Sequence, residues 1–107
     1  MTPNKQDLSL LVMQRIASAR KERRWTLRDF AQRLGWSRNT LINFEYGRRS
    51  ITIERLAEFA AALEVPPATL LIEDPDLVRL LTVLQHNPIL RQQVAFFLDT
   101  LIEDLDA

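Results

Sequence analysis

The chain has 107 residues, 47% of them hydrophobic, with no cysteine and a formal net charge of zero. This length suits one small domain with an appendage and allows a hydrophobic core, whereas a disulfide and a thiolate metal site are excluded. No apolar run approaches the roughly 20 residues of a membrane span, and residues 1–7 lack the order of a signal peptide. We therefore expect a soluble, intracellular protein without a membrane partner. The two glycines and the scarce β-branched alternation favour an all-α fold.

The zero net charge conceals a division along the chain. Residues 1–64 contain twelve Lys and Arg against seven Asp and Glu, whereas residues 65–107 contain two against seven. The first part can attract a polyanion such as a nucleic acid, and the second part cannot. Alternatively, the charge simply varies between two layers of helices.

Two helices are predicted between residues 7 and 34. Apolar residues at helical spacing predict the first helix from about Asp7 to Arg24. Thr26 can cap a second helix, because Asp29 follows three residues later as in a capping box. Gly35 then ends this helix, since glycine readily adopts the left-handed conformation that follows a helix.

Two further helices and a short turn follow. Ser37 can cap the third helix, which Gly47 ends. Thr52 can cap a fourth helix over residues 53–63, whose inward side is predicted to be Ile53, Leu56, Phe59, Ala60 and Leu63. Pro67 then starts a short turn of helix.

The last part of the chain predicts two more helices, over residues 75–85 and 88–105, each preceded by a capping residue and opened by proline. A boundary near Glu73 divides a domain of residues 1–73 from a segment of residues 74–107. This segment carries more apolar side chains than it can bury alone, so we expect a homodimer with a twofold interface. The expected interface residues are Leu80, Leu84, Leu90, Val94, Phe97, Leu98, Leu101 and Leu105. Alternatively, both helices fold back on the first domain within a monomer.

The stretch from Trp25 to Ser50 has the spacing of a helix-turn-helix. A supporting helix is followed by the turn Leu34-Gly35-Trp36-Ser37 and by a second helix that the serine caps. This spacing sets the second helix across the first, so that its outer side can enter a DNA major groove about 12 Å wide.

This stretch resembles the phage-repressor type of helix-turn-helix, the family also called xenobiotic-response-element regulators. The match runs from Thr26 through Gly47 to Ser50 and extends to roughly residues 10–72. The resemblance implies a five-helix lambda-repressor-like DNA-binding domain, followed here by the two C-terminal helices. Leu27 departs from the family, which usually has a glutamine there that touches a phosphate and braces the recognition helix. Trp36 is larger than the family's usual aliphatic residue.

The resemblance assigns base contacts to the second helix of the motif, the recognition helix. Leu41 and Phe44 face the core by their spacing, which leaves four residues for base contacts: Arg38, Asn39, Ile42 and Asn43. Arginine can bridge guanine O6 and N7, asparagine can bridge adenine N6 and N7, and an apolar side chain can touch a thymine methyl group. Alternatively, these residues form only a solvated helix surface.

The resemblance also assigns residues that position the protein on DNA. Contacts to phosphate are expected from Thr26, Arg28, Ser37, Thr40, Arg48 and Arg49, and such contacts carry no sequence information. Arg20 and Glu45 match an ion pair that fixes the recognition helix against the first helix. Trp25 is expected to belong to the core.

These observations predict a sequence-specific regulator of transcription that acts as a repressor on double-stranded DNA with an inverted repeat. No phosphate-binding glycine loop, metal-ligand spacing or acid–base pair indicates an enzyme, a cofactor or a metal site. The alternative is a protein-interaction module or antitoxin-like regulator whose residues 74–107 bind a second protein. In that case binding of the second protein survives the loss of Arg38 and Asn43. It fails when Phe97 or Leu101 becomes charged.

Overall fold

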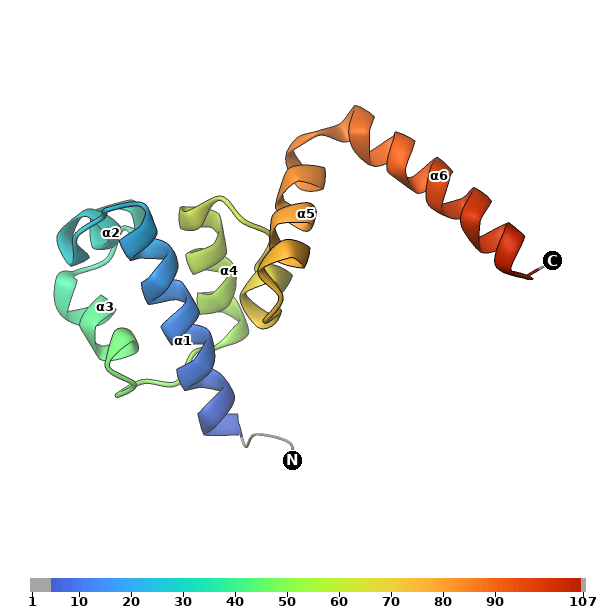
Figure 1. The fold of residues 1–107 in the computed structure, drawn as a ribbon. Coiled ribbons are helices and arrows are strands. Elements are labelled where there is room, and N and C mark those ends of the chain that lie inside the picture. Colours follow the sequence, from blue (N-terminus) through green and yellow to red (C-terminus); the bar gives the residue numbers. More distant parts are fainter. Residues whose placement is uncertain (1–4, 107) are drawn as a thin grey trace. The chain divides into compact units, whose positions relative to one another are not determined.

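A computed structural model describes residues 5–106 of the chain, with side chains from Leu8 onward. Every regular element of this described part is helical (Figure 1). The elements are α1 (Lys5–Glu22), α2 (Leu27–Leu34), α3 (Arg38–Glu45), α4 (Ile53–Leu63), the 3₁₀-helix η1 (Pro67–Leu71), α5 (Pro75–His86) and α6 (Pro88–Asp106). They divide into two compact units, a first unit that ends at Leu71 and a second unit that begins at Ile72.

The caps predicted from the sequence form as hydrogen bonds. The Asp29 N–H donates to Thr26 Oγ1 at 3.0 Å, and the Thr26 N–H donates to Asp29 Oδ2 at 2.9 Å, which completes a capping box. Gly35 has a φ of 72° in the left-handed region after α2. The hydroxyl groups of Ser37 and Thr52 accept hydrogen bonds at the starts of α3 and α4. Local chemistry therefore fixes where these short helices begin.

A non-glycine residue in the left-handed conformation follows both α1 and α4, and α1 ends two residues before the predicted position. α1 ends at Glu22, and Arg24 has a φ of 60°. α4 ends at Leu63 as predicted, and Glu64 after it has a φ of 59°. Both positions redirect the chain although neither carries the glycine that usually signals such a turn.

The core of the first unit is built around three aromatic rings that are almost completely buried: Phe30 of α2, Phe44 of α3 and Phe59 of α4. The Phe59 ring centroid lies 5.8 Å from those of both other phenylalanines. Aliphatic side chains complete the buried set: Val12, Met13, Ile16, Leu41, Leu63 and Leu70, with Ala31 and Ala60. One ring from each of three helices therefore holds the motif to α4.

The predicted inward side of α4 needs one correction. Ile53 is 83% exposed, whereas Phe59, Ala60 and Leu63 are buried and Leu56 is half-buried. Ile53 is the first residue of α4, where the helix has only just left the preceding loop. Helical periodicity placed Ile53 on the buried side of α4, but the core does not extend as far as this first residue.

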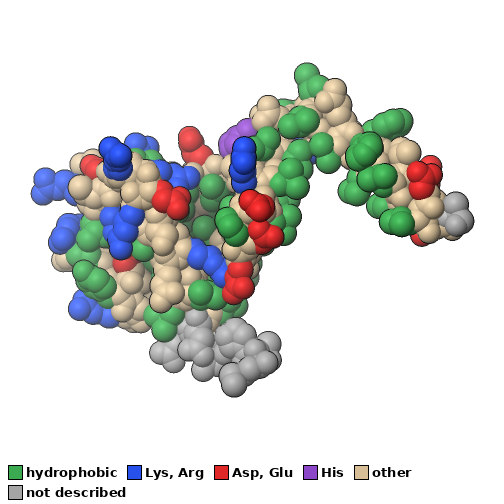
Figure 2. Space-filling model, viewed as in Figure 1, with side chains coloured by type: hydrophobic (Ala, Val, Ile, Leu, Met, Phe, Trp, Pro, Cys, Tyr) green, Lys and Arg blue, Asp and Glu red, His purple; other side chains and the backbone are tan. Residues whose placement is uncertain are grey.

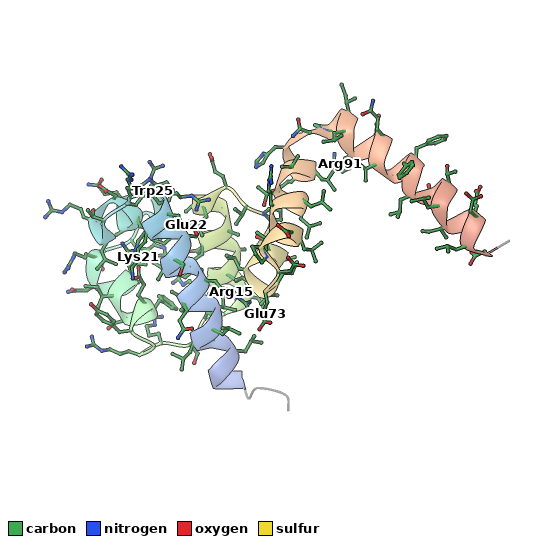
Figure 3. All side chains as sticks on the ribbon, in the orientation of Figure 1. Arg15, Lys21, Glu22, Trp25, Glu73 and Arg91 are labelled. Atoms are coloured by element: carbon green, nitrogen blue, oxygen red, sulfur yellow. The ribbon has the colours of Figure 1, made fainter. Side chains whose placement is uncertain are left out.

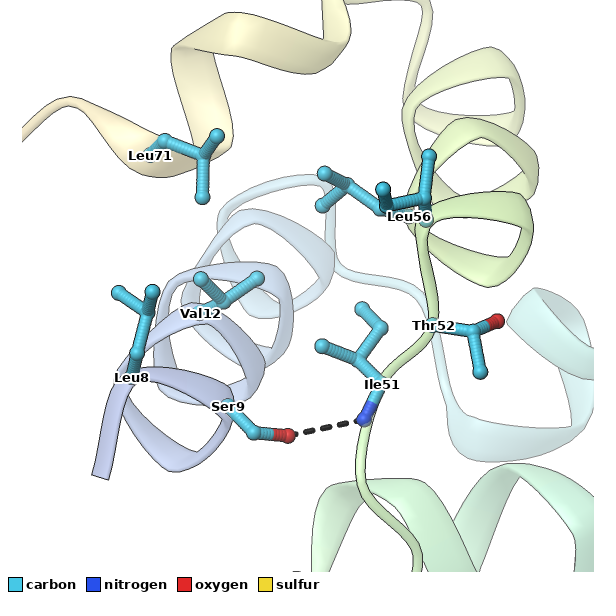
Figure 4. Close-up of a pocket in the computed structure, with 8 residues that line it drawn as sticks. Leu8, Ser9, Val12, Ile51, Thr52, Leu56 and Leu71 are labelled. Atoms are coloured by element: carbon cyan, nitrogen blue, oxygen red, sulfur yellow. Dashed lines mark hydrogen bonds between the residues drawn. The ribbon is translucent and has the colours of Figure 1, made fainter. Parts of the chain in front are cut away.

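A small apolar pocket of about 250 Å³ lies on the first unit between the start of α1, the loop before α4, and η1 (Figure 4). Its lining residues include Leu8, Val12, Leu56 and Leu71. The Ser9 hydroxyl closes one side, because its Oγ accepts a hydrogen bond from the Ile51 N–H at 2.8 Å. The pocket shares no residue with the recognition helix.

The second unit consists of α5 and α6, which contact each other and contain no buried residue. Asp74 caps α5, and Pro75 and Pro88 begin the two helices, as predicted. Most of the expected interface residues are exposed, namely Leu80, Leu90, Phe97, Leu98, Leu101 and Leu105, while Leu84 and Val94 are half-buried. Neither these helices nor any other in residues 5–106 is long and apolar enough to cross a membrane.

Candidate nucleic-acid interface

Helices α2 and α3 are the supporting and recognition helices of the motif. The turn between them is closed by the Trp36 N–H, which donates to the Ala31 carbonyl oxygen at 2.9 Å. Leu41 and Phe44 of α3 are buried in the core of the first unit. The recognition helix is therefore held along one side, and its other side can meet a partner.

The four predicted base-contact residues belong to the side of α3 that the core leaves uncovered. Arg38 and Asn39 are exposed in the first turn of the helix. Ile42 and Asn43, one turn later, are half-buried. The surface that results contains a cation, two amides and one apolar group, which are the groups that distinguish base edges in the major groove.

Hydroxyl groups at the start of α3 can hold an anion. Ser37 Oγ accepts a hydrogen bond from the Thr40 N–H at 3.1 Å and lies 2.9 Å from Thr40 Oγ1. One hydroxyl donates to the other in this pair, so the second hydroxyl hydrogen remains for an outside acceptor. The N–H groups and the dipole at a helix N-terminus favour negative charge at the same place.

The start of α2 carries an acidic and a basic side chain, Asp29 and Arg28. The Thr26 N–H, followed by the Thr26 hydroxyl, lowers the pKa of the Asp29 carboxyl below its usual value, and Arg33 and Arg28 act in the same direction. Because its carboxylate serves this cap, Asp29 is a structural group. Arg28 is exposed beside it and can reach outward to an anion.

Two arginines follow the recognition helix in the loop after Gly47. The Arg48 guanidinium carbon lies 5.7 Å from the Tyr46 ring centroid, and that of Arg49 lies 4.9 Å from the Phe44 ring centroid. Both side chains are exposed. Contact with the aromatic rings holds the two guanidinium groups in place. The loop therefore presents its positive charge at a defined position.

Arg20 and Glu45 form a two-point ion pair between α1 and the end of α3. Arg20 Nε donates to Glu45 Oε2 at 3.0 Å, and Arg20 Nη2 donates to Glu45 Oε1 at 3.1 Å. Arg20 Nη1 also donates to the Trp25 carbonyl oxygen at 2.8 Å. The exposed fractions of the two side chains are only 11% and 9%. This parallel pairing fixes the far end of the recognition helix.

A second brace at the near end of α3 was missed by the sequence analysis. Trp36 Nε1 donates to Glu58 Oε2 at 3.1 Å, and Arg55 pairs with the same carboxylate at 2.9 Å. The Arg55 guanidinium carbon lies 4.9 Å from the Trp36 ring centroid. The signal was the unusually large residue in the turn, together with an Arg and a Glu three positions apart on α4.

Trp25 and Leu27 both pack against the core from the start of α2. Trp25 lies where α1 gives way to α2 (Figure 3), and the Arg33 guanidinium carbon sits 4.0 Å from its ring centroid. Leu27 is half-buried against the same core. The side chain at position 27 therefore stabilises the motif by packing and has no polar group for a phosphate.

Charge is unevenly distributed over the two units. On the visible face, blue basic side chains gather over α2 and α3, whereas green hydrophobic side chains follow α5 and α6 (Figure 2). The residues proposed for DNA contact therefore stand within a basic surface of the first unit. Such a surface favours a polyanionic partner.

Comparison with known proteins agrees with this geometry. A family model described as "Helix-turn-helix" matches residues 16–70, which is more than half of the chain. Among solved structures, the chain is similar to the crystal structure of a hypothetical transcription factor from Neisseria, with 25% sequence identity and a TM-score of 0.60. The similarity covers 75% of this chain and 92% of the other. No curated protein matches the chain.

Proposed function

Because the chain belongs to the phage-repressor type of the helix-turn-helix family of DNA-binding transcriptional regulators, we propose that it is a repressor that reads an inverted repeat in double-stranded DNA. One observation carries the proposal. The core and the Arg20–Glu45 pair hold α3 along one side, while its other side presents Arg38, Asn39 and Asn43. A recognition helix held in this way can enter a major groove without rearranging.

In this proposal Arg38, Asn39 and Asn43 hydrogen-bond base edges, and Ile42 contacts a thymine methyl group. The chemistry of each side chain suits that task, because arginine and asparagine can each make two hydrogen bonds to a base pair. The first turn of α3 supplies Arg38 and Asn39, and the second supplies Asn43. Together they read adjacent base pairs of one half-site.

Phosphate contacts surround these base contacts and set the position of α3 in the groove. They come from Thr26, Arg28, Ser37, Thr40, Arg48 and Arg49. The support is the exposure of the three arginines and the unused hydroxyl hydrogen of the Ser37–Thr40 pair. Phosphate contacts of this kind make affinity fall steeply as salt rises.

The second unit supplies the dimer contacts. The exposed apolar side chains of α5 and α6 favour association, because large apolar side chains gathered at a surface commonly mark an interaction site. A twofold dimer places two recognition helices on an inverted repeat whose half-sites lie about one helical turn, roughly 34 Å, apart or further. Such a dimer represses transcription by covering the DNA that a polymerase would use, and its place of action is the bacterial cytosol or nucleoid.

The test of DNA reading is selection from random duplexes followed by titration of the enriched sequence at two salt concentrations. Wild-type protein should enrich an inverted repeat, and Arg38→Ala/Asn43→Ala should lose at least about 30-fold in affinity for it, since each two-bond contact contributes about 1–3 kcal/mol. Gln14→Ala/Lys21→Ala removes the same kinds of group from an exposed face of α1 and should bind as wild type does. Absence of enrichment by the wild type would refute DNA reading.

The second candidate function is binding of another protein by α5 and α6, and the same exposed apolar side chains favour it. Light scattering at micromolar concentration separates the two possibilities. We expect the mass of two chains for the wild type and of one chain for Phe97→Glu/Leu101→Glu. A wild-type mass of one chain would exclude the dimer and direct the search to a protein partner.

A further inference from the structure

Tyr46 directly follows the recognition helix and continues its uncovered side by one turn. The Tyr46 N–H donates to the Ile42 carbonyl oxygen at 2.9 Å, so the backbone keeps the helical register at this residue although α3 ends one position earlier. Residues three and four positions apart lie on the same side of a helix. This spacing puts the tyrosine on the side of Asn39, Ile42 and Asn43, which is the side proposed to face DNA.

Contacts of Arg48 give the same placement independently. The Arg48 guanidinium carbon lies 5.7 Å from the Tyr46 ring centroid, and Arg48 Nη1 donates to Asn43 Oδ1 at 3.4 Å. One guanidinium group therefore touches both side chains, and Tyr46 and Asn43 border the same patch of surface. Tyr46 is 67% exposed in this patch. An exposed aromatic residue is common by itself, but this one lies beside a proposed base contact and a cation.

We infer that Tyr46 is a further DNA contact whose hydroxyl group donates a hydrogen bond to a backbone phosphate, an inference that rests on the proposed reading of DNA by α3. The first residues of a recognition helix contact base edges, and the far end of such a helix can contact the backbone. Tyrosine is one of the side chains that bond phosphate oxygens in protein–DNA complexes. The phenol supplies one O–H donor for this purpose.

The hydroxyl and the neighbouring guanidinium contribute to affinity in different ways. A cation that neutralises a phosphate releases counterions, and this release makes affinity fall as salt rises. The Tyr46 hydroxyl is neutral, so its hydrogen bond adds affinity without changing the slope of affinity against salt concentration. A phosphate contact from Arg48 adds about one unit to that slope. Salt dependence therefore separates the two residues although they lie side by side.

The experiment titrates the sequence that the wild type enriches with Tyr46→Phe at two salt concentrations. This variant keeps the ring beside Arg48 and removes only the hydroxyl group. Its affinity should be about tenfold lower at both salt concentrations, because one hydrogen bond to a charged group is lost. The salt slope and the preferred bases should stay unchanged. Arg48→Met should also bind more weakly, but with a salt slope smaller by about one.

Ser18→Ala is the matched control, because it removes a hydroxyl group from an exposed position on α1 and should bind as the wild type does. Thermal unfolding should show that Tyr46→Phe is as stable as the wild type, since the change affects an exposed side chain. A loss of affinity then reflects a lost contact with DNA.

Three results would overturn the inference while leaving the proposed function intact. Tyr46→Phe could bind the enriched sequence as tightly as the wild type, which would mean that the hydroxyl makes no contact. It could change the preferred bases, which would make Tyr46 a base contact. It could reduce the salt slope, which would mean that the hydroxyl acts through Arg48. If the wild type enriches no sequence, the proposed function fails and this inference fails with it.

Discussion

The two units of this chain use the same local signals with opposite results for burial. In the first unit, capped helices bury three phenylalanines together with the aliphatic residues around them. In the second unit, α5 and α6 have equally clear starting signals and abundant apolar residues, yet neither helix contains a buried residue. Caps and prolines thus determine where helices begin. Burial depends instead on how many apolar helix faces pack against one another. The first unit has a core that can stabilise it by itself. The helices of the second unit need further contacts to bury their apolar side chains.

The largest expected effect tests this contrast directly. Phe59 is completely buried and Phe96 is 77% exposed. Phe59→Ala should lower the free energy of unfolding by about 3–5 kcal/mol, because it leaves a cavity among aromatic rings, whereas Phe96→Ala should change it by less than about 0.5 kcal/mol. Tryptophan fluorescence in urea is a suitable measurement, since both tryptophans, Trp25 and Trp36, belong to the first unit. Equal losses would mean that the second unit shares the core.

A smaller effect separates buried from exposed ion pairs within the first unit. Arg20→Met leaves the Glu45 carboxylate, 9% exposed, without its partner and should cost about 3 kcal/mol. Arg55→Met breaks a pair whose side chains are 35% and 43% exposed and should cost less than about 1 kcal/mol. Urea unfolding of both variants gives the comparison. If Arg20→Met lowers the free energy of unfolding no more than Arg55→Met does, the Arg20–Glu45 pair does not stabilise the position of α3.

The sequence was sufficient to predict the helices of the motif because their signals are local. A cap, a glycine and the spacing of apolar residues depend on neighbours within four positions, so Thr26, Gly35 and Ser37 were identified correctly. The family pattern added the partner of Arg20, which lies 25 positions away and which spacing alone could not have shown.

Four features were not predicted because they depend on tertiary contacts. The Trp36–Glu58 hydrogen bond spans 22 positions, and the Ser9–Ile51 hydrogen bond spans 42. The exposure of Ile53 depends on where the core ends and not on helical phase. The contact between Arg48 and Asn43 is near in sequence, but it depends on the path of the loop after α3. No residue type by itself identifies the partner in any of these three contacts.

A third prediction concerns the Ser9 hydroxyl, which holds the loop before α4 against α1. Ser9→Ala removes the acceptor of the Ile51 N–H and should cost about 1–2 kcal/mol, because a partly buried donor loses its partner. Ser18→Ala on the exposed side of the same helix should change stability by less than about 0.5 kcal/mol. Hydrogen exchange of the Ile51 amide is the direct measurement. Unchanged protection in Ser9→Ala would show that the N–H has another partner.

The smallest expected effect is a dependence of the first unit's stability on pH through Asp29. The pKa of this carboxyl is lowered in the folded protein by the Thr26 N–H and hydroxyl, so the folded state prefers the ionised group. Its contribution is therefore complete above the unfolded pKa of about 3.9 and disappears as pH falls through the lower folded value. Asp29→Ala should consequently be less stable than wild type at pH 7, and the difference should shrink at pH 2–3. Thermal unfolding at both pH values measures it. Because the carboxyl lies at the surface, the difference should also shrink in high salt, and a gap that persists at low pH would show that the cap does not depend on the charge of Asp29.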